Sequence, residues 1–131
     1  GYVERSATWM SLWAALDTLR EQRNMVVILV AHSHIVKVED PILPAFDRHT
    51  LHLYRTEAVK AIEWSDIVGY AMIKTYTVVE GTRTRATTAG ERVLLTHNNP
   101  AYTAKTRYPL PEEIPLDWNE LVKYLKPMEE N

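Results

Sequence analysis

Two histidines and a serine follow directly on an apolar run near the start of the chain. The run covers residues 25–31, and the triplet His32-Ser33-His34 comes next. Imidazoles two residues apart at the end of a strand can bind one metal ion, as they do in some metal-dependent hydrolases. Such a site needs a further ligand, and the candidates are His49, His52, His97, Asp66 and Asp40. A structural role, in which one histidine hydrogen-bonds to nearby backbone, stays open beside the metal hypothesis.

The apolar run itself predicts the element that would position this triplet. A short run rich in β-branched residues, placed after a helical pattern, predicts a strand buried on both faces of a parallel sheet. The helical pattern runs from Ser6 to Asn24, with Trp9 and Trp13 on its apolar stripe and Asn24 as a left-handed stop. Ligands bind beyond the carboxyl ends of strands in open α/β sheets, so we expect the functional site near the triplet.

The rest of the chain predicts further elements of an α/β domain. We expect a loop over 35–47, a helix over 48–64, a buried strand over 67–73 and a short helix over 118–126 that Asp117 and Glu120 cap. Strands over 75–79 and 92–96 would form an antiparallel hairpin around a polar loop at 81–90. The predicted fold is a mostly parallel sheet of about four or five strands with this hairpin at one edge.

Composition limits the classes of protein that the chain can represent. Its 131 residues predict one domain, 1–131, and 46% hydrophobic with 24% charged residues is ordinary globular composition. A formal net charge of −2 gives no overall attraction to nucleic acid, so any such contact needs a local patch. The chain has no cysteine, and no apolar run is long enough to cross a bilayer. We therefore expect a cytoplasmic protein with no membrane partner.

The order of these features resembles the RecA-like ATPases. In that family an amphipathic helix precedes a buried strand, and the strand ends in Gln or His near the nucleotide γ-phosphate. Residues 26–34 resemble this strand, because they follow a helical pattern and reach His32 at the end of the apolar run. A proline-containing loop, a helix leading into Asp66 and an apolar strand, and a hairpin follow in the same order. The segment Ala104-Lys105-Thr106-Arg107-Tyr108 is similar to the Lys-x-Arg-aromatic motif of bacterial RadA-type ATPases. The likeness covers residues 5–125 and is strongest to phage-encoded RecA-like ATP-binding proteins.

The resemblance implies roles for three residues. His32 would be the sensor of the γ-phosphate, and Lys105 and Arg107 would reach the phosphates of a nucleotide at a subunit interface. An arginine in such a position stabilises the charge that spreads over the transferring phosphoryl group. The implied cofactors are ATP and Mg²⁺, and the implied setting is recombination or single-strand DNA metabolism of a phage or prophage in a bacterial host. On physical grounds alone, a Lys-x-Arg pair beside prolines also fits a solvated surface loop.

The chain departs from this family in one large respect. It contains no Gly-x-x-x-x-Gly-Lys-Ser/Thr loop and no buried strand ending in a magnesium-binding aspartate. We therefore expect the chain to be the carboxyl half of such an ATPase, with both features upstream of residue 1. The full-length parent would be the ATPase, and this part alone would be inactive. Apolar faces left open by a missing half favour self-association.

A modest basic stripe is the candidate nucleic-acid surface. Its cations are Lys37, Arg48, Arg55 and Lys60, together with His49 and His52, and Tyr54 lies among them. Aromatic rings between cations suit single-stranded DNA because bases stack while cations follow the phosphates. An ordinary solvated helix face is the competing interpretation, and Arg83 and Arg85 form a second candidate patch. Two other functions stay open: a metal-dependent hydrolase that uses His32 and His34, and a catalytically inert binding module on a RecA-like scaffold.

Overall fold

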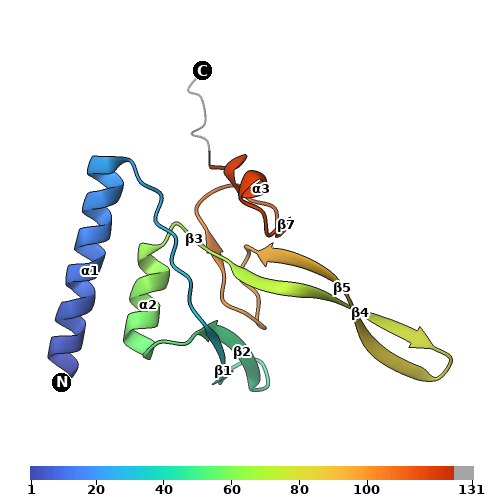
Figure 1. Ribbon diagram of the computed structural model, residues 1–131. Coiled ribbons are helices and arrows are strands. Elements are labelled where there is room, and N and C mark those ends of the chain that lie inside the picture. The colour runs from blue at the N-terminus through green and yellow to red at the C-terminus, as the bar shows by residue number, and fades with distance from the viewer. Residues whose placement is uncertain (126–131) are drawn as a thin grey trace.

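The computed structural model describes residues 1–125, apart from the side chains of residues 85–89. It is a mixed α/β structure with helices at both ends of the described chain and short strands between them (Figure 1). The helices are α1 (Tyr2–Arg23), α2 (Arg55–Trp64) and α3 (Trp118–Val122). The strands are β1 (Ser33–Val38), β2 (Phe46–Leu51), β3 (Ile67–Val68), β4 (Tyr70–Glu80), β5 (Arg83–Leu95), β6 (Lys105–Thr106) and β7 (Glu113–Pro115).

The strands form three small antiparallel sheets, so the predicted mostly parallel sheet is wrong. The first sheet pairs β1 with β2, the second pairs β3 with β6, and the third has the order β4-β5-β7. In the described part of the chain, the only parallel pairing is an isolated bridge between His49 and Tyr102. Short connections between neighbouring strands produce antiparallel pairs, whereas a parallel pair needs a long crossover.

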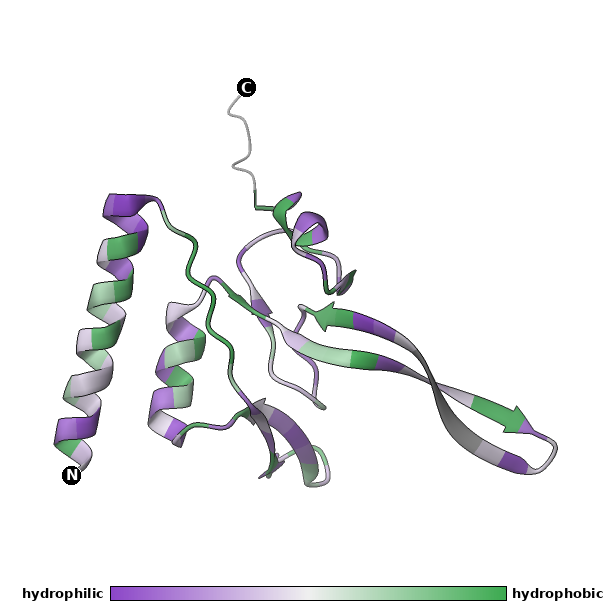
Figure 2. Cartoon of the chain, in the orientation of Figure 1, coloured by the Kyte–Doolittle hydropathy of each residue, from purple (hydrophilic) through white to green (hydrophobic). Residues whose placement is uncertain are grey.

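The apolar run at 25–31 is not a buried strand. It is an extended connection from the end of α1 to β1 that belongs to no sheet (Figures 1 and 2). Most of it is exposed: Val26 is 62%, Ile28 is 66% and Val30 is 95% accessible. Its β-branched composition favours an extended backbone. No described segment lies alongside it to complete a ladder, and composition alone cannot supply a partner strand.

The segment after the triplet also differs from its prediction. Residues 35–47 were expected as a loop and 48–64 as a helix, but β1 and β2 form a hairpin and helix α2 begins only at Arg55. The register pairs His34 with Thr50 and Val36 with Arg48. Alternating burial along β1 matches a half-buried strand, a pattern with a period of two that the loop prediction overlooked.

The predicted hairpin over 75–96 is present, but the polar loop inside it is not. Strands β4 and β5 continue to a tight turn at Gly81, whose φ of 60° lies in the left-handed region that favours glycine. Gly90, at φ 77°, lies where the register shifts beyond Ile73, which is the position of a β-bulge. The two glycines thus mark a turn and a bulge within one long ribbon instead of the two ends of a loop.

The three helices agree with their predicted positions more closely than the strands do. Asn24 ends α1 with φ 52°, the predicted left-handed stop. Asp117 caps α3 by accepting a hydrogen bond from the Asn119 backbone N–H at 2.8 Å, and α3 ends at Val122. The predicted extension of this helix over residues 123–125 is wrong, because these residues form a turn and a bend, and residue 126 lies outside the described residues.

Aromatic rings and a small apolar core join the elements. Trp13 of α1 is buried, and its ring lies 5.5 Å from that of Trp9 and 5.0 Å from that of Trp64, at the end of α2. This confirms the core role predicted for Trp13. The other buried apolar residues are Ala58, Ala61, Val93, Ala104, Leu110 and Ile114. Among the described residues, no helix has the length and apolarity that crossing a membrane requires.

Candidate functional site

Strand β6 brings the two predicted phosphate-contacting cations to the carboxyl end of α2. Val68 of β3 pairs with Lys105, which fixes β6 beside the end of that helix. The Lys105 Nζ donates hydrogen bonds to the carbonyl oxygens of Ile62 at 2.8 Å and Glu63 at 3.0 Å. The last carbonyls of a helix lack partners within the helix and carry partial negative charge. Lys105 therefore caps α2 and is held in one place by it.

Arg107 lies two residues further along and is anchored to the same region. Its Nη2 donates to the Glu63 carbonyl at 2.7 Å, and its Nη1 donates to the Asp66 carboxylate at 2.5 Å. Its backbone N–H also donates to the Asp66 carbonyl at 2.9 Å. Residues i and i+2 of an extended segment lie on one face, so the Lys-x-Arg spacing places both cations at the end of α2.

Asp66 is the residue around which this cluster is organised. Its second carboxylate oxygen accepts from Arg20 of α1 at 3.3 Å, and Arg20 also contacts Asp17 at 3.0 Å. The Trp64 indole N–H donates to the same Asp17 at 2.9 Å. The network therefore ties the ends of α1 and α2 to the segment that carries Arg107. The side chains of Arg107 and Asp66 are about half exposed, so their ion pair adds little to the stability of the fold. Arg107 can therefore leave Asp66 for another anion at small cost.

Sequence reasoning did not give Arg20 or Asp66 this role. Arg20 lies in the last turn of α1, where any basic side chain complements the helix dipole, and the sequence suggests Asp66 only as a metal ligand. Their separation of 46 residues hides the contact from any local pattern. The one local signal for such a network was the Lys-x-Arg segment. Two cations that become partly buried need an acidic partner nearby, because a buried unpaired charge is costly.

His32 lies apart from these cations. It is exposed and precedes β1, and its carbonyl accepts a hydrogen bond from the His52 backbone N–H at 2.8 Å. No hydrogen bond, ion pair or ring contact of the described structure joins His32 to Lys105 or Arg107. The structure therefore groups two of the three residues implied by the resemblance and leaves the third on a separate segment.

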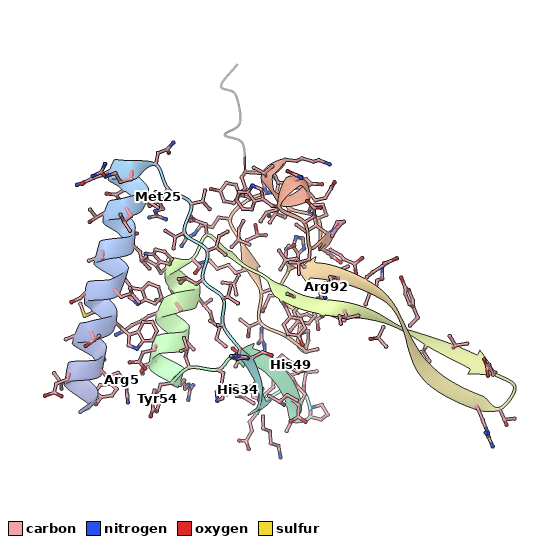
Figure 3. The ribbon with its side chains drawn as sticks, in the orientation of Figure 1. Arg5, Met25, His34, His49, Tyr54 and Arg92 are labelled. Carbon is pink, nitrogen blue, oxygen red and sulfur yellow. The ribbon has the colours of Figure 1, made fainter. Side chains whose placement is uncertain are left out.

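The His-x-His pair does not assemble a metal site in the described chain. The His34 ring lies 4.5 Å from the His52 ring. Figure 3 shows His34 beside the β1–β2 hairpin. Among the residues that the structure describes, no group of three His, Cys, Asp or Glu side chains is placed to hold a metal ion. The metal-dependent hydrolase thus lacks a third ligand among the residues that the structure describes.

The residues of the basic stripe are distributed over different surfaces. Lys37 pairs with Asp47 across the β1–β2 hairpin, whereas Arg48 pairs with Val36. Directly opposed residues share a face and neighbours alternate, so Lys37 and Arg48 point to opposite faces. Arg55 begins α2 and Lys60 follows five residues later, which places them on different sides of the helix. The stripe predicted along one helix therefore does not form. Of the second patch, Arg83 begins β5 and the side chain of Arg85 lies outside the described residues.

A buried ion pair holds α1 against α2 at the other end of the helices. Glu57 is 1% exposed, and its carboxylate lies 3.7 Å from the Nε of Arg5. The Arg5 guanidinium also covers the Tyr54 ring at 3.9 Å, and both residues are labelled in Figure 3. The Thr56 hydroxyl donates to Glu57 at 2.6 Å and holds the pKa of that carboxyl below its usual value, with Arg5 contributing in the same direction.

The class of protein is given by comparison with known protein families. A family model described as an AAA domain matches residues 1–108, which is most of the chain. The chain belongs to this AAA-domain family. No curated protein and no solved structure matches it.

AAA domains generally bind ATP with Mg²⁺, and the residues that the structure describes do not by themselves form a site for that pair. A phosphate cradle is built from glycine backbone, but the internal glycines have other roles. Gly81 and Gly90 make the turn and the bulge, and a Cβ at Gly69 would lie 2.4 Å from the Leu94 side chain. Asp66, the acidic residue before β3, is engaged by two arginines instead of being open to a magnesium ion.

Proposed function

We propose that the chain is the carboxyl half of a RecA-like ATPase core, in which Lys105 and Arg107 contact the phosphates of a nucleotide held by residues outside this chain. Membership of the AAA-domain family supports a nucleotide-binding ATPase. The observation that carries the finer proposal is the common anchoring of Lys105 and Arg107 on the carboxyl end of α2. Cations that a rigid element already holds in position stabilise the charge of a transition state more than flexible cations do.

The Asp66 network allows Arg107 to change partners at small cost. Asp66 keeps its contact with Arg20 when Arg107 turns to a phosphate, so no carboxylate is left unpaired. Arg107 also leaves a half-exposed pair, and such pairs contribute about 0–1 kcal/mol. A phosphate oxyanion offers Arg107 bidentate hydrogen bonds in exchange. Asp66 then acts as the residue that positions Arg107 in the absence of nucleotide.

The proposed biological setting follows the resemblance. It is DNA recombination or single-strand DNA metabolism of a phage or prophage, in the cytoplasm of a bacterial host. His32 is the proposed γ-phosphate sensor. In support of this role, His32 follows an apolar segment whose backbone pairs with no strand among the described residues. A strand from the rest of the ATPase core that pairs with residues 25–31 would carry His32 toward the nucleotide. Single-stranded DNA, ATP and Mg²⁺ are the proposed ligands of the whole protein.

The decisive experiment compares ATP turnover with and without a phosphate-binding loop. The 131-residue chain alone should show no magnesium-dependent ATP hydrolysis above background, and turnover by a homogeneous sample would overturn the proposal. In a polypeptide that joins this chain to the phosphate-binding loop encoded beside it, Arg107→Ala should lower turnover by about 10³-fold or more. Arg23→Ala, at the exposed end of α1, is the matched control.

The same experiment separates the ATPase from an inert binding module. If Arg107→Ala leaves ATP turnover unchanged while the control is also active, Lys105 and Arg107 only cap α2. The proposal that they contact the nucleotide phosphates then fails. If the neighbouring coding sequence holds no Gly-x-x-x-x-Gly-Lys-Ser/Thr segment, the chain is a binding module that kept an ATPase scaffold. Sequencing of the coding region decides this before any protein is made.

A further inference from the structure

A groove beside β2 and β6 is lined by basic and neutral residues only. Its volume is about 700 Å³. The lining residues are Arg48, Ile62, Thr96, His97, Asn98, Thr103, Ala104, Lys105 and Thr106. None of these is acidic, although the whole chain carries a formal net charge of −2. The groove therefore concentrates positive charge on a protein that is otherwise slightly negative, which attracts anions locally.

Arg48 is the residue in this groove that most needs a partner. Its Nη2 donates to the Asn98 side-chain oxygen and, at 3.5 Å, to the Tyr102 carbonyl, so neutral groups fix its position. Its Nε is buried with no acceptor, and within the described residues no carboxylate lies at ion-pair distance from it. A buried N–H of a charged group without an acceptor is costly and is normally satisfied by a water or an ion.

Lys105 provides a second donor on the wall of the groove, and the His97 ring provides a third in its protonated, imidazolium form. Lys105 gives two of its three ammonium hydrogens to the carbonyls of α2, which leaves one for a ligand. The Nε2 of His97 lies 2.9 Å from the Leu110 carbonyl and must donate to it, so the Nδ1 is the ring atom left for other contacts. The nearest carboxylate to that Nδ1 is Glu112 at 3.9 Å, and its side chain is 86% exposed.

We propose that this groove binds a phosphate group through Arg48, Lys105 and His97. A tetrahedral oxyanion can accept hydrogen bonds from Arg48 and Lys105, and from His97 in its imidazolium form, and charge-assisted bonds of this kind are stronger than neutral ones. The phosphate belongs either to a nucleotide or to the backbone of single-stranded nucleic acid, and both present the same oxygens. This site goes beyond the nucleotide contact proposed above, because it requires Arg48 and His97 and does not use Arg107.

The two sites also differ in position along the chain. Arg107 does not line the groove, and it is bound to Asp66 instead. Lys105 is the residue that the two proposals share. A test on Arg48 therefore examines the groove without disturbing the Arg107 contact.

The test measures binding of two probes to the 131-residue chain at low ionic strength. Pyrophosphate is titrated by calorimetry, and a fluorescent single-stranded dT20 oligonucleotide by anisotropy. At least one probe should bind, and Arg48→Gln should weaken that binding about tenfold or more because one charge-assisted hydrogen-bonding group is lost. Arg23→Gln removes the same charge from an exposed site outside the groove and should leave binding unchanged. Binding of dT20 alone assigns the groove to nucleic acid, and binding of pyrophosphate assigns it to nucleotides.

Nuclear magnetic resonance on the unmutated chain locates the bound probe directly, so the proposal can be tested even if a variant fails to fold. Backbone amides of residues 96–98 and 103–106 should shift on titration with the bound probe. Absence of binding by both probes overturns the proposal, as does equal weakening by Arg48→Gln and Arg23→Gln. Shifts confined to residues outside the groove overturn it as well. If Arg48→Gln weakens binding of the probe but leaves ATP turnover of the joined polypeptide unchanged, the groove is a separate site from the Arg107 contact.

Discussion

Replacement of Trp13 should test how α1 is attached to the rest of the molecule. Trp13 is the one residue of α1 that is buried, and its ring contacts Trp9 and Trp64 at centroid distances of 5.5 and 5.0 Å. Trp13→Ala removes both aromatic contacts and leaves a cavity between α1 and α2. Changes of this kind in a core cost about 3–5 kcal/mol, and the thin contact of a peripheral helix favours the lower end, about 3 kcal/mol.

A second substitution at Trp13 separates ring packing from polarity. The Trp13 indole N–H is buried without an acceptor, so Trp13→Phe keeps an aromatic ring and removes an unsatisfied donor. The expected loss is therefore smaller, about 1 kcal/mol. Met10→Ala serves as the matched control, because Met10 lies on the same helix and is 63% exposed.

Urea unfolding followed by far-ultraviolet circular dichroism measures these free energies. A loss of about 3 kcal/mol lowers the melting temperature of a chain of this size by roughly 10 °C. The reasoning is refuted if Trp13→Ala and Met10→Ala are equally stable, because α1 would then be attached by its ion pairs and not by the tryptophan cluster. It is also refuted if Trp13→Phe is as damaging as Trp13→Ala.

Two further predictions concern acid stability and assembly. The pKa of Glu57 is lowered from its usual 4.5 in the folded state, so its contribution to stability is present above pH 4.5 and is lost as the pH falls below that value. Glu57→Gln should flatten the acid limb of a plot of unfolding free energy against pH, and an unchanged limb would rule out this role. The exposed apolar run at 25–31 should drive self-association. Sedimentation should show species heavier than 15.1 kDa that Ile28→Lys reduces, and a purely monomeric protein at high concentration would contradict this.

Local chemistry in the sequence was enough to predict that three helices form, the end of α1 and the start of α3. Asn24 stops α1 because an asparagine tolerates the left-handed conformation, and Asp117 caps α3 because a short carboxylate side chain reaches the free backbone N–H groups. These features depend on residues within one or two turns of each other, and tertiary packing does not override them.

Strand pairing and charge partners were decided only by the tertiary structure. Residues 25–31 have the composition of a buried strand, but a strand needs a neighbour with free backbone groups, and the described chain places none beside them. Arg107 finds Asp66 across 41 residues, and Arg48 finds Asn98 across 50. Such contacts follow from the path of the whole chain, so neither the Asp66 network nor the basic groove beside β6 could be derived from local sequence patterns.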